Sequence, residues 1–303
     1  MIHEYAIEPN VLCAWSESKR DYAEFLREYG LGTPRIFSSF PKLKPHKLRS
    51  YFLQSAPADE SSQKGRRYIE MVNKLVETIV LREVEPVVSG DWGSHVRSEN
   101  QRAPFNVIIS SEFLEMDECI TSETMYDLES RWLHSDQINI QRTDEGISRA
   151  VSSFLRLSTK QVVIIDTFGW TPEAIVQMQS LISRLIQNRV HSQLPEVKLF
   201  YKQHQKSPNA HHVKGKITDG VNLGAAALKL DVFELEEIPG NDVFHNRCVL
   251  TEHGGVITGH GIGVSGEEEH TDEATLMRPD IYQKKWRQFI DENCFQIVSE
   301  AGG

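Results

Sequence analysis

The interpretation of this 303-residue chain depends on the stretch His245-Asn246-Arg247-Cys248-Val249-Leu250-Thr251-Glu252. Six residues separate this stretch from Gly259-His260-Gly261. Side chains alternate along a β-strand, so His245 and Arg247 are expected on one face, which Val249 continues inward. Turn residues at 252–255 and the apolar run that follows them predict a second strand. We therefore expect a β-hairpin that returns Gly259 and His260 to the side of His245.

The residue types in this hairpin are suited to phosphate chemistry. The planar guanidinium of Arg247 can bind a phosphate through two parallel hydrogen bonds. An imidazole such as that of His245 can act as a nucleophile or as a general acid. We take His245, Arg247, Glu252 and His260 as candidate catalytic residues, and Asp166, Asn246 and Gly259 as candidate substrate-binding residues.

The sequence upstream predicts a β-α-β unit. Gln161–Asp166 is a short apolar run, typical of a strand buried on both faces. Thr171-Pro172-Glu173 has the residues of a helix start, and an apolar stripe continues to Ile186 before the next strand candidate at 197–201. Asp166 ends the first strand, where α/β folds place functional groups, although it could equally cap the helix start.

The order of these elements, with the spacing of H-x-R, the acid and G-H-G, resembles the phospholipase D superfamily over roughly residues 145–297. It is more similar to a divergent branch with H-D/N-R and G-H-G or G-R-G than to the lipases proper. This branch includes the C-terminal membrane-binding domain of MIT-domain proteins, which is thought to bind lipids without hydrolysing them. Bacterial proteins of similar layout also carry H-N-R and G-H-G, some in mobile-element or defence-like gene settings.

The resemblance implies an α/β fold with a phospholipase D-like mixed sheet flanked by helices. It also implies a phosphodiesterase without metal or cofactor, in which His245 attacks phosphorus, Arg247 holds the phosphate oxygens and a second histidine protonates the leaving oxygen. Such sites combine two motifs, so a homodimer is expected. Arg247, Glu252 and His260 stand where the family has lysine, aspartate and serine. Two hypotheses follow: a nuclease, rather than a lipase, in a bacterial defence or mobile-element setting, and an inactive phosphate-, lipid- or nucleic-acid-binding or scaffolding module.

A second segment, His212-Val213-Lys214 with Asp219, satisfies H-x-K-x4-D literally. The polar residues within 215–218 interrupt the apolar run of a buried strand, and Ser207-Pro208-Asn209 before it favours a loop or a capped helix. A second half-site, with His212 as partner of His245, stays open. The histidines at 204, 211, 212 and 270 accompany no short cysteine pair, so we interpret them as surface residues and not as metal ligands.

Composition and charge limit the remaining interpretations. The chain is long enough for two domains, which we place at 1–140, an α+β region of unknown role, and 141–303, the phospholipase D-like domain. The net charge of −10 argues against a nonspecific nucleic-acid coat, but a local basic groove can still bind a polyanion. No apolar run approaches a transmembrane span, no signal peptide begins the chain and the four cysteines are far apart, so we expect a cytoplasmic location and only peripheral lipid contact.

The N-terminal half offers few chemical signals. Its basic stretch Pro41–Arg49 could meet phosphates or an acidic protein partner, or be a solvated surface. Spacing predicts a helix over 68–79 and a strand over 105–109. The acidic stretch 110–144 is expected to be a connector or an interaction surface. Near the other end, apolar spacing after Pro279 predicts a helix that seals the core.

Overall fold

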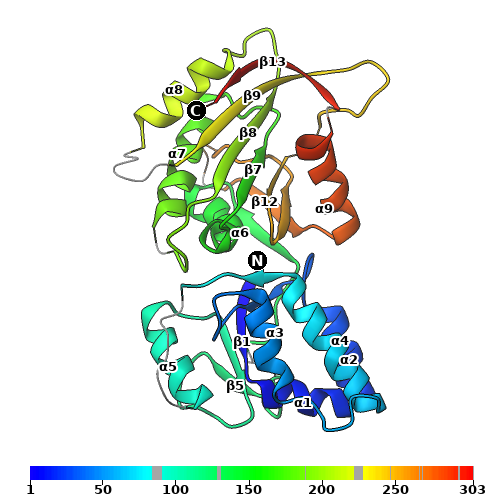
Figure 1. Ribbon diagram of the computed structural model, residues 1–303. Coiled ribbons are helices and arrows are strands. Elements are labelled where there is room, and N and C mark those ends of the chain that lie inside the picture. Colours follow the sequence, from blue (N-terminus) through cyan, green and yellow to red (C-terminus); the bar gives the residue numbers. More distant parts are fainter. Residues whose placement is uncertain are drawn as a thin grey trace. The chain divides into compact units, whose positions relative to one another are not determined.

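The computed structural model describes residues 1–83, 91–127, 131–187, 189–221, 228–245, 247–265, 267, 269–292 and 294–302. The chain forms two compact units, Ile2–Ser135 and Asp136–Gly303, the latter together with Met1. Each unit has its own β-sheet, with helices packed on it (Figure 1).

The N-terminal unit is built on a parallel five-stranded sheet of order β3-β2-β1-β4-β5. Its strands are β1 (His3–Ile7), β2 (Arg35–Ser38), β3 (Ile79–Val80), β4 (Val107–Ser110) and β5 (Cys119–Thr121). Its helices are α1 (Pro9–Glu17), α2 (Lys19–Glu28), α3 (Pro45–Leu53), α4 (Gln63–Glu77) and α5 (Trp92–Arg102). We expected an α+β region here, but parallel strands joined through helices are the α/β pattern. The predicted helix over 68–79 corresponds to α4, and the strand over 105–109 to β4.

Alternation along the strands gives this sheet two apolar faces. Tyr5 and Ile7 of β1 lie in a large core with buried residues of α1–α4, whereas Ala6 between them packs with Ile108 and with Val96 of α5. Successive side chains of a strand point to opposite faces, so burial on both faces explains the continuous apolar strands.

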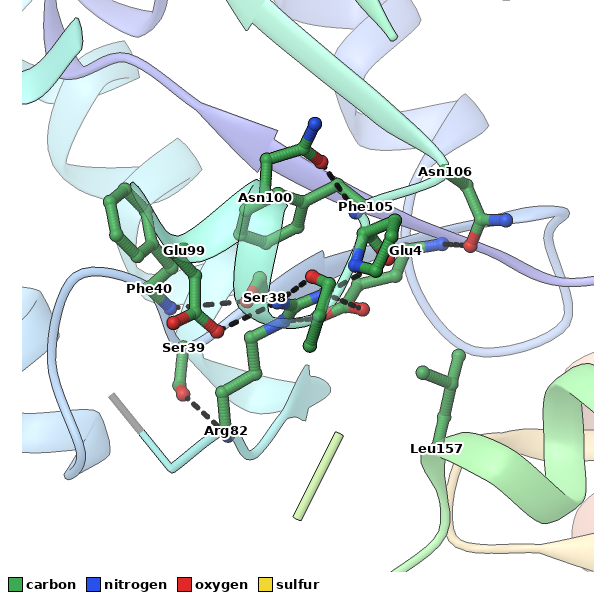
Figure 2. A network of polar contacts seen from close by, with 12 residues as sticks. Glu4, Ser38, Ser39, Phe40, Arg82, Glu99, Asn100, Phe105, Asn106 and Leu157 are labelled. Carbon is green, nitrogen blue, oxygen red and sulfur yellow. Dashed lines mark hydrogen bonds and ion pairs between the residues drawn. The ribbon is translucent and has the colours of Figure 1, made fainter. Parts of the chain in front are cut away.

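A buried ion network fixes the end of β3 to α5 (Figure 2). The guanidinium of Arg82 donates to both carboxylate oxygens of Glu4, at 2.6 and 2.7 Å, and to Glu99 at 2.8 Å. It lies 3.7 Å from the ring centroid of Phe105, and Arg82 is 1% exposed. Burial alone would lower the pKa of Arg82, but the two carboxylates outweigh it and raise the pKa. All partners are internal, so the network is structural.

The C-terminal unit is built on an eight-stranded mixed sheet of order β13-β9-β8-β7-β10-β11-β12-β6. The parallel strands β7 (Gln161–Ile165), β8 (Glu196–Lys202) and β9 (Leu230–Glu237) form its centre. The antiparallel strands are β6 (Gln137–Gln141), β10 (Cys248–Thr251), β11 (Gly254–Thr258), β12 (Thr271–Leu276) and β13 (Phe295–Ala301). Within the described residues, the helices of this unit are α6 (Asp144–Leu157), α7 (Pro172–Ile186), α8 (Ala210–Asp219) and α9 (Pro279–Trp286), the last continued by the π-helical turn η1 (Arg287–Asp291).

This mixed sheet flanked by helices confirms the predicted fold class. The β-α-β unit is also confirmed, because β7 and β8 pair in parallel and α7 connects them. Thr171 caps α7 as expected, with its hydroxyl accepting a hydrogen bond from the Ala174 N–H. The helix predicted after Pro279 is α9, with Tyr282 buried.

The acidic stretch 110–144 is more than a connector. It contains β5, an edge strand of the first sheet, and β6, an edge strand of the second. Asp144 lies in the first turn of α6, where a negative charge favours the helix dipole. Across the described residues, no helix is long and apolar enough to cross a membrane.

Candidate functional site

The predicted hairpin lies at the edge of the sheet where the parallel strands end. β10 pairs antiparallel with β7 on one side and with β11 on the other, so the start of β10 meets the ends of β7 and β11. The strand begins at Cys248, later than expected, and His245 and Arg247 precede it. Arg247 extends the ladder, because its carbonyl accepts a hydrogen bond from the Thr258 N–H at 3.2 Å.

Asp166 joins two loops at this edge. It is 2% exposed and directly follows β7. Its Oδ1 accepts the Phe168 N–H and its Oδ2 accepts the Ile262 N–H, each at 2.8 Å. Burial raises the pKa of Asp166, although these two hydrogen bonds and the nearby Arg247 and Arg142 oppose the rise. The carboxyl group therefore fixes the loop after β11 to the end of β7.

Gly261 is required by this arrangement. Its φ of +83° belongs to the left-handed region, which side chains rarely adopt. A Cβ atom there would lie 2.2 Å from Oδ2 of Asp166 and 3.0 Å from Cδ of Arg247. The G-H-G motif thus lets the backbone approach the buried carboxylate closely.

Arg247 is anchored at one point of its guanidinium. Its Nη1 donates to the carbonyl of Gly259 at 3.2 Å, and its Cζ lies 5.3 Å from the ring centroid of Phe168. A guanidinium carries five N–H donors in a fixed planar fork. Most of them remain for an anionic ligand at this edge.

His260 is held by a carboxylate that the sequence did not indicate. Oδ2 of Asp272 on β12 accepts the His260 backbone N–H at 2.9 Å, and Oδ1 lies 3.4 Å from the imidazole Nδ1. The side chain of Asp272 is 6% exposed, whereas that of His260 is 58% exposed. With Nδ1 beside the carboxylate, Nε2 is the ring nitrogen left for chemistry. Asp272 also accepts the Gly259 N–H at 3.2 Å, so one side chain positions both residues.

His245 is exposed and lies near the ends of β8 and β9. Glu237, the last residue of β9, accepts hydrogen bonds from Lys202 at 2.6 Å and from the Phe244 N–H at 2.8 Å. Lys202 is the main cause of the lowered pKa of Glu237, and His245 contributes to it. Lys202 is a second cation of this edge that sequence reasoning missed. Asn246, a predicted substrate-binding residue, lies outside the described residues.

Arg142 is a third cation of this edge. It directly follows β6, and its Nη2 donates to the Gly263 carbonyl at 3.3 Å. Its Nε is buried without a hydrogen-bond partner, and its charge favours the ionised form of Asp166. The loop after β11 is therefore bounded by Arg142 and Arg247. No spacing rule connects these residues, because they are more than a hundred positions apart.

The structure does not bring Glu252 together with the other candidates. Glu252 lies in the hairpin turn, at the end of β10 remote from Arg247. It accepts hydrogen bonds from the Ser158 hydroxyl at 2.5 Å and from the N–H groups of Thr159 and Lys160 at 2.6 and 2.9 Å. Burial alone would raise the pKa of Glu252, but His253 and these hydrogen bonds lower it. Its carboxylate fixes the α6–β7 connection.

The literal H-x-K segment at 212–219 is helical. It lies in α8, whose cap Asn209 accepts the His212 N–H at 3.0 Å. The capped-helix interpretation is therefore confirmed, and a strand-borne half-site at His212 is not found. His204, His211, His212 and His270 are exposed, as expected. In the part of the chain that the structure describes, no three His, Cys, Asp or Glu side chains are grouped as metal ligands.

Comparisons with known proteins concern the architecture. No protein-family model and no curated protein sequence matches the chain. Nuc from Salmonella typhimurium, a phospholipase D family member, is structurally similar over 54% of this chain and 97% of its own, with 9% identity and a TM-score of 0.35. Polyphosphate kinase from Porphyromonas gingivalis matches over 56% of this chain and 28% of its own, with 10% identity and a TM-score of 0.33. The archaeal chromatin protein TrmBL2 matches over 56% of this chain and 57% of its own, with 10% identity and a TM-score of 0.31.

Proposed function

We propose that the C-terminal unit binds a phosphodiester at the carboxyl edge of its sheet and cleaves it by a route that uses no metal. One observation carries the proposal: Arg247 and His260 are anchored to the same short segment. The Gly259 carbonyl accepts a hydrogen bond from Arg247, and the Asp272 carboxylate accepts hydrogen bonds from the N–H groups of Gly259 and His260. A phosphate-binding cation and an oriented imidazole are thus presented together.

The local charge is suited to an anion even though the chain is acidic. Arg247, Arg142 and Lys202 lie at this edge. Glu237 offsets Lys202, and the nearly buried carboxylates of Asp166 and Asp272 accept backbone N–H groups of the loops. A guanidinium fork recognises two phosphate oxygens at once. A local basic site is compatible with a net charge of −10, because dissolved ions screen the distant charges and the ligand interacts mainly with the groups near it.

Cleavage requires two imidazoles with different protonation. A neutral imidazole nitrogen attacks phosphorus, the N–P bond forms and the P–O bond to the leaving alcohol breaks. A protonated imidazole gives its proton to that oxygen, and water then displaces the histidine from phosphorus. We assign His245 as nucleophile or acid and His260, held by Asp272, as the supporting histidine. The pair comes from one chain or from two chains of a homodimer.

A second candidate function is a noncatalytic phosphate-, lipid- or nucleic-acid-binding or scaffolding module. It is favoured by His245, whose ring makes no hydrogen bond within the described residues, so that nothing orients it for attack. Binding through Arg247 does not require that orientation. The ligand is then a nucleic acid or a phospholipid headgroup. A defence setting and a protein partner for the N-terminal unit stay predictions from the sequence.

The test uses the full chain in excess EDTA with labelled single- and double-stranded DNA, RNA and phospholipids. The wild type is compared with His245→Ala, His260→Ala and Arg247→Ala. His211→Ala is the matched control, because His211 is an exposed histidine on α8. Cleavage that survives EDTA and is lost in the two histidine variants supports the enzyme. If the chain binds without cleaving, and Arg247→Ala is the variant that loses binding, the result supports the noncatalytic binding module. Binding that Arg247→Ala leaves unchanged contradicts both.

A further inference from the structure

The candidate phosphate site has an aromatic neighbour that neither cleavage nor phosphate binding requires. Phe168 lies two residues after Asp166, where the loop starts, and is 45% exposed. A single exposed apolar side chain is ordinary on a protein surface. Its place is not ordinary, because its ring lies under the guanidinium of Arg247, with 5.3 Å between Cζ and the ring centroid.

Hydrogen bonds hold the backbone of Phe168 in place. The Phe168 N–H donates to Oδ1 of Asp166 at 2.8 Å, and the Phe168 carbonyl accepts the Thr171 N–H at 3.0 Å. The Gly169 N–H donates to the Asp166 carbonyl at 3.0 Å. The residue is therefore tied on both sides into the tight connection from β7 to α7. A ring on a fixed backbone loses less entropy when a ligand stacks on it.

A second aromatic pair lies at the same edge. Trp170 stacks with His204, which follows β8, with ring centroids 5.9 Å apart and planes 14° from parallel. The indole Nε1 of Trp170 is buried without a hydrogen-bond partner, so the ring rather than its polar atom accounts for the contact. The residues after β7 and β8 thus carry flat side chains, and one of them, Phe168, contacts the cation that we assign to phosphate.

We propose that Phe168 is a stacking surface for a nucleobase and that the site takes single-stranded nucleic acid. This inference rests on the proposed function, since it assigns the phosphate to Arg247. A nucleotide joins a flat ring to a phosphate, which matches the neighbouring ring and guanidinium, whereas a phospholipid headgroup offers no flat ring. In a duplex the base faces are covered by their neighbours, so stacking on protein requires unpaired bases.

The experiment measures equilibrium binding of fluorescent oligonucleotides to the full chain in EDTA at fixed salt. The probes are a single strand, its duplex, and an abasic strand that keeps the sugars and phosphates without bases. Phe168→Leu keeps an apolar side chain without a flat face, and Phe168→Trp keeps the face. Phe113→Leu is the matched control, because Phe113 of the N-terminal unit is 63% exposed.

We expect Phe168→Leu to weaken single-strand binding by about 5- to 150-fold, the range measured for one base–aromatic stack. Phe168→Trp and Phe113→Leu retain the affinity, and the abasic strand binds wild type and Phe168→Leu alike. The inference is overturned if Phe168→Leu binds the normal strand as the wild type does, or if the wild type binds duplex or abasic strand equally well.

The two failures can be told apart through Arg247. If Arg247→Ala weakens binding of the abasic strand while Phe168→Leu changes nothing, the phosphate site stands and the base site fails. If Arg247→Ala leaves the abasic strand unaffected, the proposed function itself fails. Vesicles of phosphatidylserine and phosphatidylcholine complete the test. Binding to vesicles that Phe168→Leu weakens, without binding to oligonucleotides, assigns the ring to a membrane and overturns the inference.

Discussion

Asp272 contacts His260 at two points: Oδ2 accepts the backbone N–H at 2.9 Å, and Oδ1 lies 3.4 Å from the imidazole Nδ1. The carboxylate is nearly buried and the ring largely exposed. This arrangement fixes which ring nitrogen is available to a ligand. It also makes Asp272 a positioning residue, because it acts through His260.

Asp272→Asn is expected to lower kcat per folded molecule by about 10- to 100-fold, since general acid–base catalysis contributes about 10²–10⁴-fold. It also loosens the loop, because the amide turns an N–H₂ toward the N–H of Gly259 or of His260. The double variant Asp272→Asn with His260→Ala should be no worse than His260→Ala alone. Steady-state kinetics in EDTA measure both. Glu267→Gln is the control, because it alters another carboxylate–histidine pair, with His270 at 2.9 Å. A raised KM with unchanged kcat would contradict the assignment.

Gly261→Ala tests the close approach of the loop to Asp166. Positive φ costs an alanine about 1–2 kcal/mol, and the Cβ would also overlap Oδ2 of Asp166, 2.2 Å away. We expect a destabilised C-terminal unit and the loss of phosphodiester binding, measured by urea unfolding and by oligonucleotide titration. Gly263→Ala is the matched control two residues later, where the nearest atom to an added Cβ is 3.9 Å away. Equal losses of stability and binding in the two variants would show that the close approach of Gly261 to Asp166 is not required.

The sequence predicted the central part of the C-terminal unit well because its signals are local. The apolar run at 161–165, the cap at Thr171 and the hairpin after Cys248 each depend on residues close together in the chain. The contacts of the site depend instead on residues that are far apart in the chain. Asp166 reaches Ile262, and Arg142 reaches Gly263, across about a hundred residues or more. Only the sheet order, with β10 beside β7 and β6 beside β12, brings these positions together.

Glu252 shows why spacing alone misplaces a role. Its interval from His245 suggested a supporting group of the site. A strand of about 3.3 Å per residue instead carries it away from that edge. In the N-terminal unit, β3 has two residues and β5 three, too few for a period-two pattern. The parallel sheet was therefore not recognised in the sequence.

Glu252→Gln is expected to lower stability without lowering activity per folded molecule. The amide replaces one of the two accepting oxygens by an N–H₂, which then faces either the Ser158 hydroxyl or the N–H groups of Thr159 and Lys160, at a cost of about 1–3 kcal/mol at neutral pH. The pKa of Glu252 is lower in the folded chain, so its stabilisation is present above pH 4.5 and lost as the pH falls through the folded value. Urea unfolding between pH 3 and pH 7 should show the two proteins converge on acidification. A loss of kcat in the fully folded variant would show that Glu252 contributes to catalysis.

Arg82→Met is expected to destabilise the N-terminal unit by about 3–5 kcal/mol, because it leaves the carboxylate of Glu4 buried without a counter-charge and that of Glu99 with Arg102 as its remaining cation. Arg27→Met is the matched control: Arg27 also pairs with a glutamate, but its side chain is 71% exposed, and such exposed pairs contribute little to stability. Urea unfolding of the full chain measures both. Adding Glu4→Gln and Glu99→Gln to Arg82→Met should recover part of the loss, since it removes the buried charges that lost Arg82 as a partner. If the triple variant is less stable than Arg82→Met, the stranded carboxylates are not the cause, and lost packing against Phe105 accounts for the effect.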